Sequence, residues 1–167
     1  NTDLYRRGNF AGTFDNLLCD SMSEILDSEI CLSPGFRWGP TVLSGTKIKM
    51  EDIFNQTAIT YPNVYSLYMT SETIKNILED VADNIFNSDP YLQQGGDMVR
   101  TKGLRYQITP SKKINYRISN IFTANGKRLQ PNKQYKVSGW ASTNSEELGK
   151  PIWEVTKEYL KSIKYYD

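Results

Sequence analysis

The residues best suited to bind a ligand surround Arg37, in the run SPGFRWG at positions 33–39. Glycines let the backbone approach a ligand closely, and a guanidinium group can hold a sulfate, phosphate or carboxylate through two parallel hydrogen bonds. Arg37 is therefore the leading candidate for contact with an oxyanion. The alternative is structural, with Phe36 and Trp38 packed in the core and Arg37 pointing into solvent.

Two further groups of residues could join Arg37 at an anion site. Arg6 and Arg7 form a basic pair near the start of the chain, although such a pair is also typical of a solvated surface. The second group places a glycine pair, whose amides could form an anion-binding concavity, before a carboxylate and a guanidinium. Paired glycines also serve as plain turns. The members of this second group are Gly95, Gly96, Asp97 and Arg100.

Tyr61 and Trp140 stand beside loop-forming residues and could form the walls of a binding site. An equally good interpretation makes them structural aromatic residues at strand ends. Glu79, Asp80 and Asp83 resemble a carboxylate cluster, but they flank an apolar stripe at helical spacing, so we expect a solvated helix face rather than a metal site.

The chain has 167 residues and no histidine, with 38% hydrophobic residues and a formal net charge of +1. This composition is typical of a folded domain, and it provides neither a histidine general base nor a histidine metal cluster. The near-neutral charge and the lack of a long apolar run predict no nucleic-acid partner and no membrane partner. We expect Cys19 and Cys31 to be buried, unpaired thiols.

The spacing of apolar residues predicts which elements must position these candidates. Thr13 is a plausible cap for the first helix, and Thr70 or Ser71 for the central one. The dipeptide Asn125-Gly126 predicts a tight turn between two strands, and Pro151 opens the last helix. The expected helices are 14–26, a short turn at 50–54, 74–86 and 152–163, and the expected strands are 29–33, 64–69, 104–108, 114–121 and 135–139. Residues 93–97 are expected to form a loop.

This order of helices and strands lacks regular alternation, which predicts an α+β fold rather than a doubly wound parallel sheet. We expect one domain over residues 1–167, with helices packed on a mixed sheet. The loop that carries Arg37 would leave the carboxyl end of the strand 29–33.

Several motifs resemble the C-terminal domain of the 5'-nucleotidase superfamily. They are GTFDNLLCD at 12–20, the strand leading to Arg37, GTKI at 45–48, YPN at 61–63 and the helix beginning at Ile74. Within that superfamily, further motifs resemble the SoxB family of thiosulfohydrolases of bacterial sulfur oxidation. These are LSPGFRWG at 32–39, DPY at 89–91, QQGGDMVR at 93–100, GWAS at 139–142 and GKPIW at 149–153. The resemblance extends over nearly the whole chain.

The resemblance implies a substrate-binding domain that follows an N-terminal metallophosphoesterase domain, which this sequence does not include. That domain would hold two divalent metal ions, expected to be manganese, so the present chain would contain no catalytic residue and no metal ligand. The implied reaction is the release of sulfate from a cysteine S-thiosulfonate on a SoxYZ-like carrier protein. The implied location is the periplasm, and alone the chain would be inactive.

Carried over to this sequence, the loop arginine of the superfamily is Arg37 and its basic pair is Arg6 or Arg7. The stacking aromatic falls near Tyr61. A nucleotidase usually has an Asn-Gly-Gly-Gly type of loop where this chain has Ser33 to Phe36, and a Gly-Gly-Asp-Gly segment that is missing after Trp140. Two alternatives remain, namely the substrate-binding domain of a nucleotidase or related phosphoesterase, and a non-enzymatic module that binds an anion or a peptide.

Overall fold

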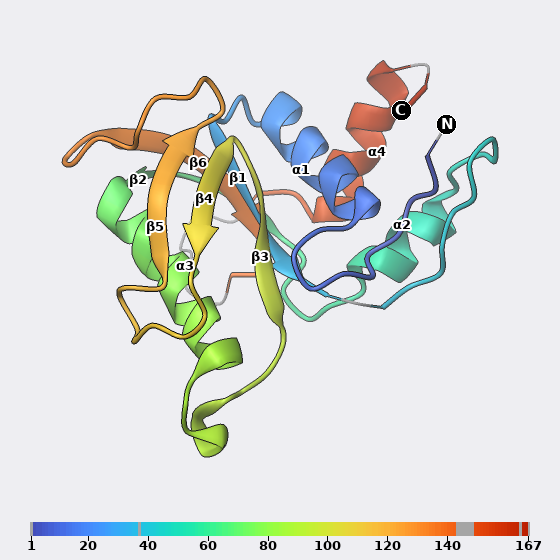
Figure 1. The fold of residues 1–167 in the computed structure, drawn as a ribbon. Helices are drawn as coiled ribbons and strands as arrows, with labels where there is room; N and C mark the ends of the chain where they lie inside the picture. Colours follow the sequence, from blue (N-terminus) through green and yellow to red (C-terminus); the bar gives the residue numbers. More distant parts are fainter. Residues whose placement is uncertain (1, 37, 143–148, 164, 167) are drawn as a thin grey trace.

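The computed structural model of the protein describes residues 2–36, 38–142, 149–163 and 165–166. Its helices and strands form the α+β fold with a mixed sheet that the sequence predicts (Figure 1). The helices are α1 (Thr13–Ile25), α2 (Met50–Thr57), α3 (Ser71–Phe86) and α4 (Ile152–Ser162), with a 3-10 turn η1 (Pro90–Leu92). The strands are β1 (Ile30–Gly35), β2 (Val64–Thr70), β3 (Asp97–Lys102), β4 (Leu104–Ile108), β5 (Ile118–Thr123) and β6 (Gln134–Trp140).

The main sheet has four strands in the order β2-β6-β1-β3. Strands β1 and β6 are parallel, with Leu32 opposite Gly139, while β2 and β3 run antiparallel to their neighbours. Because the two central strands are parallel, their carboxyl ends lie together at one edge of the sheet. The segments that leave this edge are the loop after Gly35 and the residues after Trp140.

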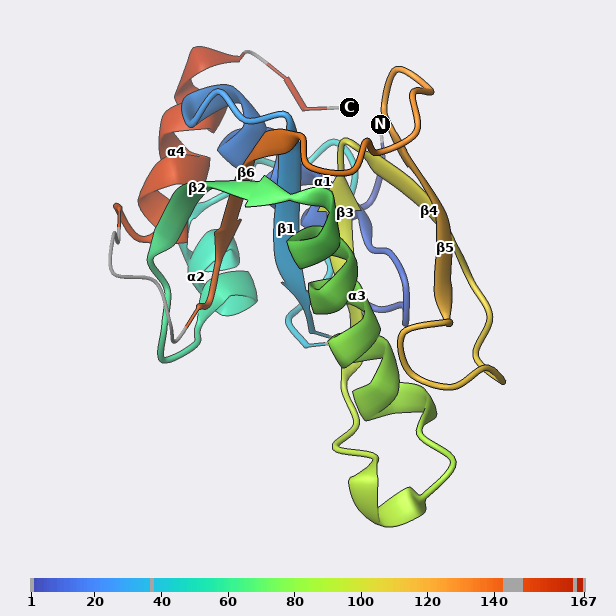
Figure 2. The same cartoon turned by 90° about the vertical axis from the view of Figure 1, so that its left-hand side faces the viewer.

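Helices α1, α2 and α4 cover one face of this sheet, and α3 covers the other (Figures 1 and 2). Alternate residues of each strand supply the two cores, so Cys31 packs with the α1 side whereas Ile30 and Leu32 pack with the α3 side. Strands β4 and β5 form a separate antiparallel pair, called here the β4–β5 ribbon, which packs on the α3 side through Leu104, Ile118 and other buried residues.

A buried ion network fastens this ribbon to α3. The Glu79 carboxylate accepts hydrogen bonds from the backbone amides of Asn115 (2.9 Å), Arg117 (3.3 Å) and Ile118 (2.7 Å). The Arg117 guanidinium group in turn binds Asp83 at 2.5 Å. We call these three side chains, Glu79, Asp83 and Arg117, the Glu79 network. Glu79 is only 1% exposed, so the expected solvated face is wrong at this residue, because folding supplies its carboxylate with three donors.

Other elements differ from the sequence prediction in detail. Residues 97–102 form β3, of which Asp97 was expected to lie in a loop, and the strand expected at 114–121 begins only at Ile118. Before it, the Tyr116 amide donates to the Lys113 carbonyl oxygen and Asn115 has φ +72°, which is turn geometry. Thr70 caps α3 as expected.

Thr13 is the first residue of α1 rather than its cap, which is Gly12. The Thr13 hydroxyl donates to the Asp3 carbonyl oxygen at 2.6 Å and accepts from the Tyr5 amide at 3.0 Å. It therefore holds the N-terminal segment against α1. No helix among the described residues combines the length and apolar character needed to cross a membrane.

Candidate functional site

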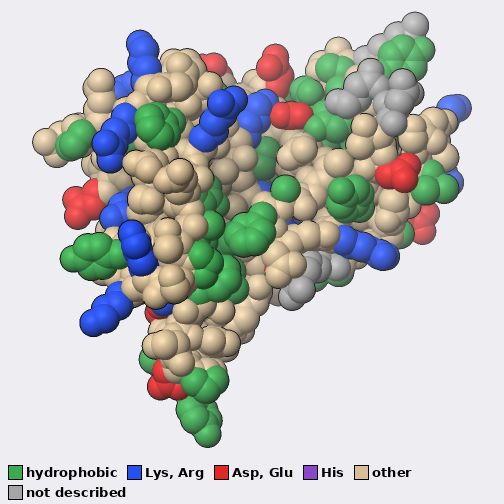
Figure 3. Space-filling view, viewed as in Figure 1, with side chains coloured by type: hydrophobic (Ala, Val, Ile, Leu, Met, Phe, Trp, Pro, Cys, Tyr) green, Lys and Arg blue, Asp and Glu red, His purple; other side chains and the backbone are tan. Residues whose placement is uncertain are grey.

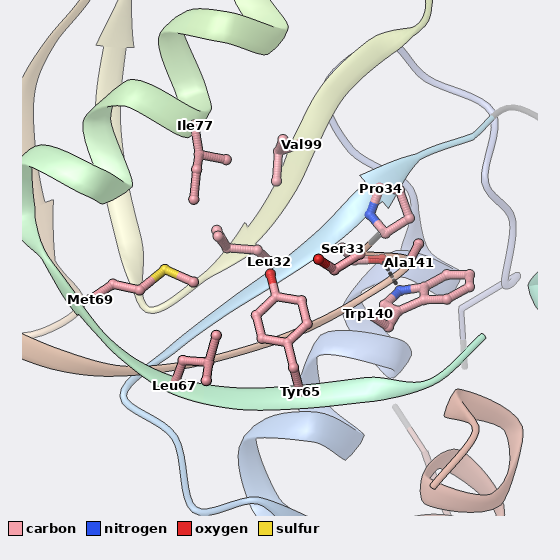
Figure 4. Close-up of a pocket in the computed structure, with 11 residues that line it drawn as sticks. Leu32, Ser33, Pro34, Tyr65, Leu67, Met69, Ile77, Val99, Trp140 and Ala141 are labelled. Carbon is pink, nitrogen blue, oxygen red and sulfur yellow. Dashed lines mark hydrogen bonds between the residues drawn. The ribbon is translucent and has the colours of Figure 1, made fainter. Parts of the chain in front are cut away.

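A cavity of about 410 Å³ lies beside the carboxyl ends of β1 and β6, on the face of the sheet that α3 covers (Figure 4). Its volume is within the range of small-molecule sites. Its lining comes from β1, β2, α3, β3 and the end of β6, and consists of Leu32, Ser33, Pro34, Tyr65, Leu67, Met69, Ile77, Val99, Trp140, Ala141 and Ser142. None of these described lining residues is charged, so the cavity suits an uncharged, largely apolar group.

The Tyr65 phenol ring stands upright in this cavity, with its hydroxyl group directed toward the space between Leu32 and α3 (Figure 4). Burial raises the pKa of Tyr65 to about 12, so the phenol stays protonated and can donate a hydrogen bond at neutral pH. Gly139 leaves room for this ring, because a Cβ at Gly139 would collide with the Tyr65 hydroxyl group and lie 2.8 Å from the Leu32 carbonyl oxygen.

Trp140 forms the inner wall of the cavity and is 3% exposed. Its indole nitrogen donates to the Ser33 hydroxyl oxygen at 2.8 Å, which links the ends of β6 and β1. The next residue, Ala141, has φ +64°, in the left-handed region that residues with a Cβ rarely occupy. Such strain persists only where surrounding contacts impose it, and here it turns the chain at the mouth of the cavity.

A second buried ion network supports the wall formed by Pro34 and Trp140. The Asp15 carboxylate lies 2.7 Å from the Arg6 Nε atom and 3.2 Å from the Arg100 Nε atom, and Arg100 also approaches Asp97 at 3.5 Å. We call these residues, Arg6, Asp15, Asp97 and Arg100, the Asp15 network. Burial raises the pKa of Asp15, while both guanidinium groups oppose this rise by favouring the carboxylate.

Arg6 reaches from this network to the cavity wall and is fully buried. It donates to the carbonyl oxygens of Pro34 and Gln56, each at 2.7 Å. Its guanidinium carbon also lies 5.3 Å from the centre of the Phe36 ring and 5.8 Å from that of the Trp140 ring. Arg6 therefore positions the end of β1 through contacts inside the protein. This placement does not favour direct contact between Arg6 and a ligand. Contact of Arg6 with the substrate remains a prediction.

The other predicted site residues are placed as follows. Arg100 donates to the carbonyl oxygens of Gly8 and Met98, so its guanidinium group, like that of Arg6, is occupied inside the protein. Asp97 is 6% exposed and lies in β3, whereas Arg7 is exposed. Arg37 lies outside the described residues. The Asp15 carboxylate at the centre of the network was missed, although a carboxylate beside the apolar residues of a helix could have indicated a buried cation partner.

The glycine pair lies next to the end of β1. The register of β1 and β3 pairs Gly35 with Asp97, so Gly95 and Gly96 precede β3 beside the segment that continues from Gly35. Both have positive φ, +81° and +95°, and the Gly95 amide donates to the Asn84 carbonyl oxygen at 3.0 Å. Gly96 thus immediately precedes the β3 residue that faces Gly35.

Aromatic rings near this edge pack on one another. Phe36 and Trp38 are stacked with their centres 4.0 Å apart, and Phe36 meets Trp140 edge-on at 6.2 Å. Tyr61 is 53% exposed and does not belong to the lining of the cavity. A nucleobase sandwich needs two rings separated by the thickness of a third. Among the described residues, the stacked pair near the cavity leaves no such space.

Other predicted features concern thiols and metal ions. Cys19 and Cys31 are free and buried, as expected, and burial raises the pKa of Cys19 well above its usual value. In the part of the chain that the structure describes, no three side chains of Cys, Asp or Glu gather closely enough to hold a metal ion.

The family model of the 5'-nucleotidase C-terminal domain matches residues 2–145. Among solved structures, the sulfate thiohydrolase SoxB of Thermus thermophilus, in complex with glycerol, aligns with 96% of this chain at 36% sequence identity and a TM-score of 0.86. The 5'-nucleotidase precursor of Thermus thermophilus aligns with 99% of the chain at 17% identity and a TM-score of 0.73.

The NAD nucleotidase of Haemophilus influenzae aligns with 89% of the chain at 17% identity and a TM-score of 0.53. At this identity, the two nucleotidases show likeness of fold alone. The chain spans only 31%, 36% and 25% of the SoxB, 5'-nucleotidase and NAD nucleotidase chains, respectively. No curated protein matches the sequence.

Proposed function

The chain belongs to the family of 5'-nucleotidase C-terminal domains, and from this premise we propose that it is the substrate-recognition domain of a SoxB-like hydrolase. The proposed substrate is a cysteine S-thiosulfonate on a SoxYZ-like carrier protein, and the proposed location is the periplasm. Two divalent metal ions, which we expect to be manganese, would be held by an N-terminal metallophosphoesterase domain. There they would supply an activated water molecule.

The observation that carries this proposal is the uncharged cavity beside the end of β1. A cysteine S-thiosulfonate has an anionic end and a neutral stem of sulfur and carbon atoms, so it needs cationic or amide donors next to an apolar space. The sequence places Arg37 two residues after the end of β1, and Gly96 precedes Asp97, which faces Gly35 at that end. The Gly95 amide is already bound to the Asn84 carbonyl oxygen, so Gly96 is the better amide candidate. The cavity is apolar apart from hydroxyl groups such as those of Tyr65 and Ser33.

A nucleotide would need a different arrangement. Its base is a flat ring that nucleotidase-like sites hold by stacking, but Phe36 and Trp38 stack on each other and Trp140 is buried. The identity of 36% to SoxB, against 17% to the 5'-nucleotidase precursor, supports the same choice. The stacking of Phe36 on Trp38 and the burial of Trp140 thus favour a sulfur compound over a nucleotide.

In the proposed reaction, the oxygen atom of water bonds to the terminal sulfonate sulfur. The bond from that sulfur to the neighbouring sulfane sulfur breaks, and the sulfane sulfur takes up a proton. The products are sulfate and a cysteine persulfide on the carrier, and no oxidant or reductant is required. This domain would bind the substrate and orient its sulfonate group, with Tyr65 donating a hydrogen bond to the neutral stem or the adjoining peptide.

The test uses the full-length protein with manganese, and a peptide whose cysteine carries an S-thiosulfonate group. We expect release of sulfate, measured by ion chromatography, and little release of phosphate from adenosine monophosphate. Tyr65→Phe should raise KM about three- to tenfold with little change in kcat, since it removes one hydrogen bond made to bound substrate. Tyr68→Phe is the matched control, because Tyr68 lies on the same strand, is 68% exposed and does not line the cavity.

Three results would contradict the proposal. Faster release of phosphate from the nucleotide than of sulfate from the peptide would indicate a nucleotidase. Binding of the peptide without turnover by the full-length protein would indicate a non-enzymatic module. Metal-dependent turnover by the purified 167-residue chain alone would show that the catalytic groups lie within it.

A further inference from the structure

Charge is distributed very unevenly along this chain. Residues 98–145 contain ten of the twenty Lys and Arg residues and none of the nineteen Asp and Glu residues. The rest of the chain therefore carries ten basic and nineteen acidic residues. Although the formal net charge of the chain is only +1, this segment is strongly basic. It includes most of β3, the β4–β5 ribbon and β6.

Only some of these ten cations are neutralised by neighbouring carboxylates. Four pair with acidic side chains from other parts of the fold, namely Arg100 with Asp15, Lys102 with Asp20, Arg117 with Asp83, and Lys136 with Asp27. The other six are exposed, and no salt bridge joins any of them to an acidic side chain among the described residues. We call these six the ribbon cations: Arg105, Lys112, Lys113, Lys127, Arg128 and Lys133.

The ribbon cations are spread over the outer face and both ends of the ribbon. Arg105 lies within β4, opposite Phe122 of β5, so these two side chains share the face that points away from the core. Lys112 and Lys113 lie in the connection from β4 to β5, and the other three follow β5. Figure 3 shows Lys and Arg side chains gathered over the side of the molecule that β4 and β5 form in Figure 1.

Apolar side chains are exposed within the same surface. Tyr116 is 70% exposed and Ile114 43% exposed, both beside Lys112 and Lys113, and Phe122 is half-buried on the outer face. Aromatic residues and arginine are enriched in the parts of protein interfaces that contribute most to affinity. A surface that combines cations with exposed apolar groups therefore suits a partner protein better than a partner that presents only a uniform layer of negative charge.

We propose that the outer face of the β4–β5 ribbon is a docking surface for an acidic patch on another protein. The partner patch would combine several Asp or Glu residues, facing the ribbon cations, with apolar side chains that pack on Tyr116 and Phe122. Opposite charges on the two surfaces would accelerate their association and fix its orientation. The ribbon cations do not line the apolar cavity, so this surface is separate from the proposed substrate site.

The charge of the rest of the chain argues for a protein rather than a nucleic acid or a bilayer. Charges interact over about 8–10 Å at physiological salt. A long or extended polyanion that reached beyond the ribbon would meet the acidic excess of the rest of the chain. Glu29 and Glu72, for example, line hollows at the margin of the ribbon together with Arg128. A compact acidic patch can contact the ribbon and avoid these carboxylates.

The test measures binding of a fluorescent 20-residue peptide, in which Glu alternates with Leu and Tyr, to the full-length protein by fluorescence anisotropy. The ribbon variant carries Lys112→Glu and Lys127→Glu. The control variant carries Lys47→Glu and Lys161→Glu, two exposed residues outside the ribbon that change the net charge equally. We expect Kd to rise about tenfold or more in the ribbon variant and less than about twofold in the control. Tyr116→Ser should weaken binding with little change in its salt dependence.

Several outcomes would overturn the proposal. Equal losses in the two variants would mean that only the total charge matters, and failure of the wild type to bind the peptide would refute the surface directly. Tighter, ribbon-dependent binding of a DNA duplex or of phosphatidylglycerol vesicles would assign it to another class of partner. If Lys112 and Lys127 resist acetylation in the folded full-length protein, another part of that protein covers the ribbon.

Discussion

The Asp15 network and the Glu79 network each contain a buried carboxylate and a carboxylate–arginine pair, but they lie next to different parts of the fold. Arg6 of the Asp15 network contacts the Pro34 carbonyl oxygen and the rings of Phe36, after β1, and Trp140, at the end of β6 beside the cavity. The Glu79 network joins α3 to the β4–β5 ribbon and includes no residue that lines the cavity. Two networks of similar chemistry can therefore stabilise the same domain while only one of them positions the candidate site.

Loss of the Asp15 carboxylate tests this difference with the largest expected effect. Asp15→Ala leaves the buried guanidinium group of Arg6 without its carboxylate and weakens the pairing of Arg100. Breaking a buried ion pair in this way typically costs about 3–5 kcal/mol. We expect a loss of this size in the free energy of unfolding of the 167-residue chain, measured by urea denaturation. The near-UV circular dichroism of the Phe36, Trp38 and Trp140 cluster should also change, because Arg6 touches two of these rings.

Glu79→Gln is the matched test of the other network. The amide oxygen can still accept some of the three backbone hydrogen bonds, but it loses the charge and introduces an NH₂ group among amide donors. We expect a cost of about 2–3 kcal/mol, the scale of hydrogen bonds to a charged group. The near-UV spectrum of the aromatic cluster should not change. A spectral change as large as that of Asp15→Ala would show that both networks position the cavity, which would remove the distinction between them.

The sequence predicted the helices around both networks but not the contacts that define them. Apolar periodicity located α1, α3 and α4, because each buries one continuous stripe against the sheet. Strand β3 was missed because Gly95 and Gly96 indicate a turn, and because its charged residues do not alternate in the usual way. Arg100 is buried there because Asp15, which is distant in the sequence, pairs with it, and the Asp97 carboxylate lies 3.5 Å from the same guanidinium group.

The cavity could not be predicted for a similar reason. Leu32, Tyr65, Ile77 and Val99 come from four elements and become neighbours only through the sheet order and the position of α3. The local motifs were better guides to the edge where the cavity lies. The motifs at 33–39 and 139–142 include Pro34 and Trp140, which line the cavity. They did not indicate that Arg6 and Arg100 would be used inside the protein.

The smallest effect on stability is expected at an ion pair that is partly exposed to solvent. Lys102 and Asp20 lie 2.7 Å apart, as close as Arg6 and Asp15, but their side chains are 44% and 28% exposed. Solvent screens such a pair, and ordering the long lysine side chain offsets much of the attraction. Lys102→Gln should therefore lower the free energy of unfolding by less than about 1 kcal/mol, and by less still in 1 M NaCl. A loss comparable to that of Asp15→Ala would mean that the distance between the charges, rather than their burial, determines how much an ion pair contributes to the free energy of unfolding.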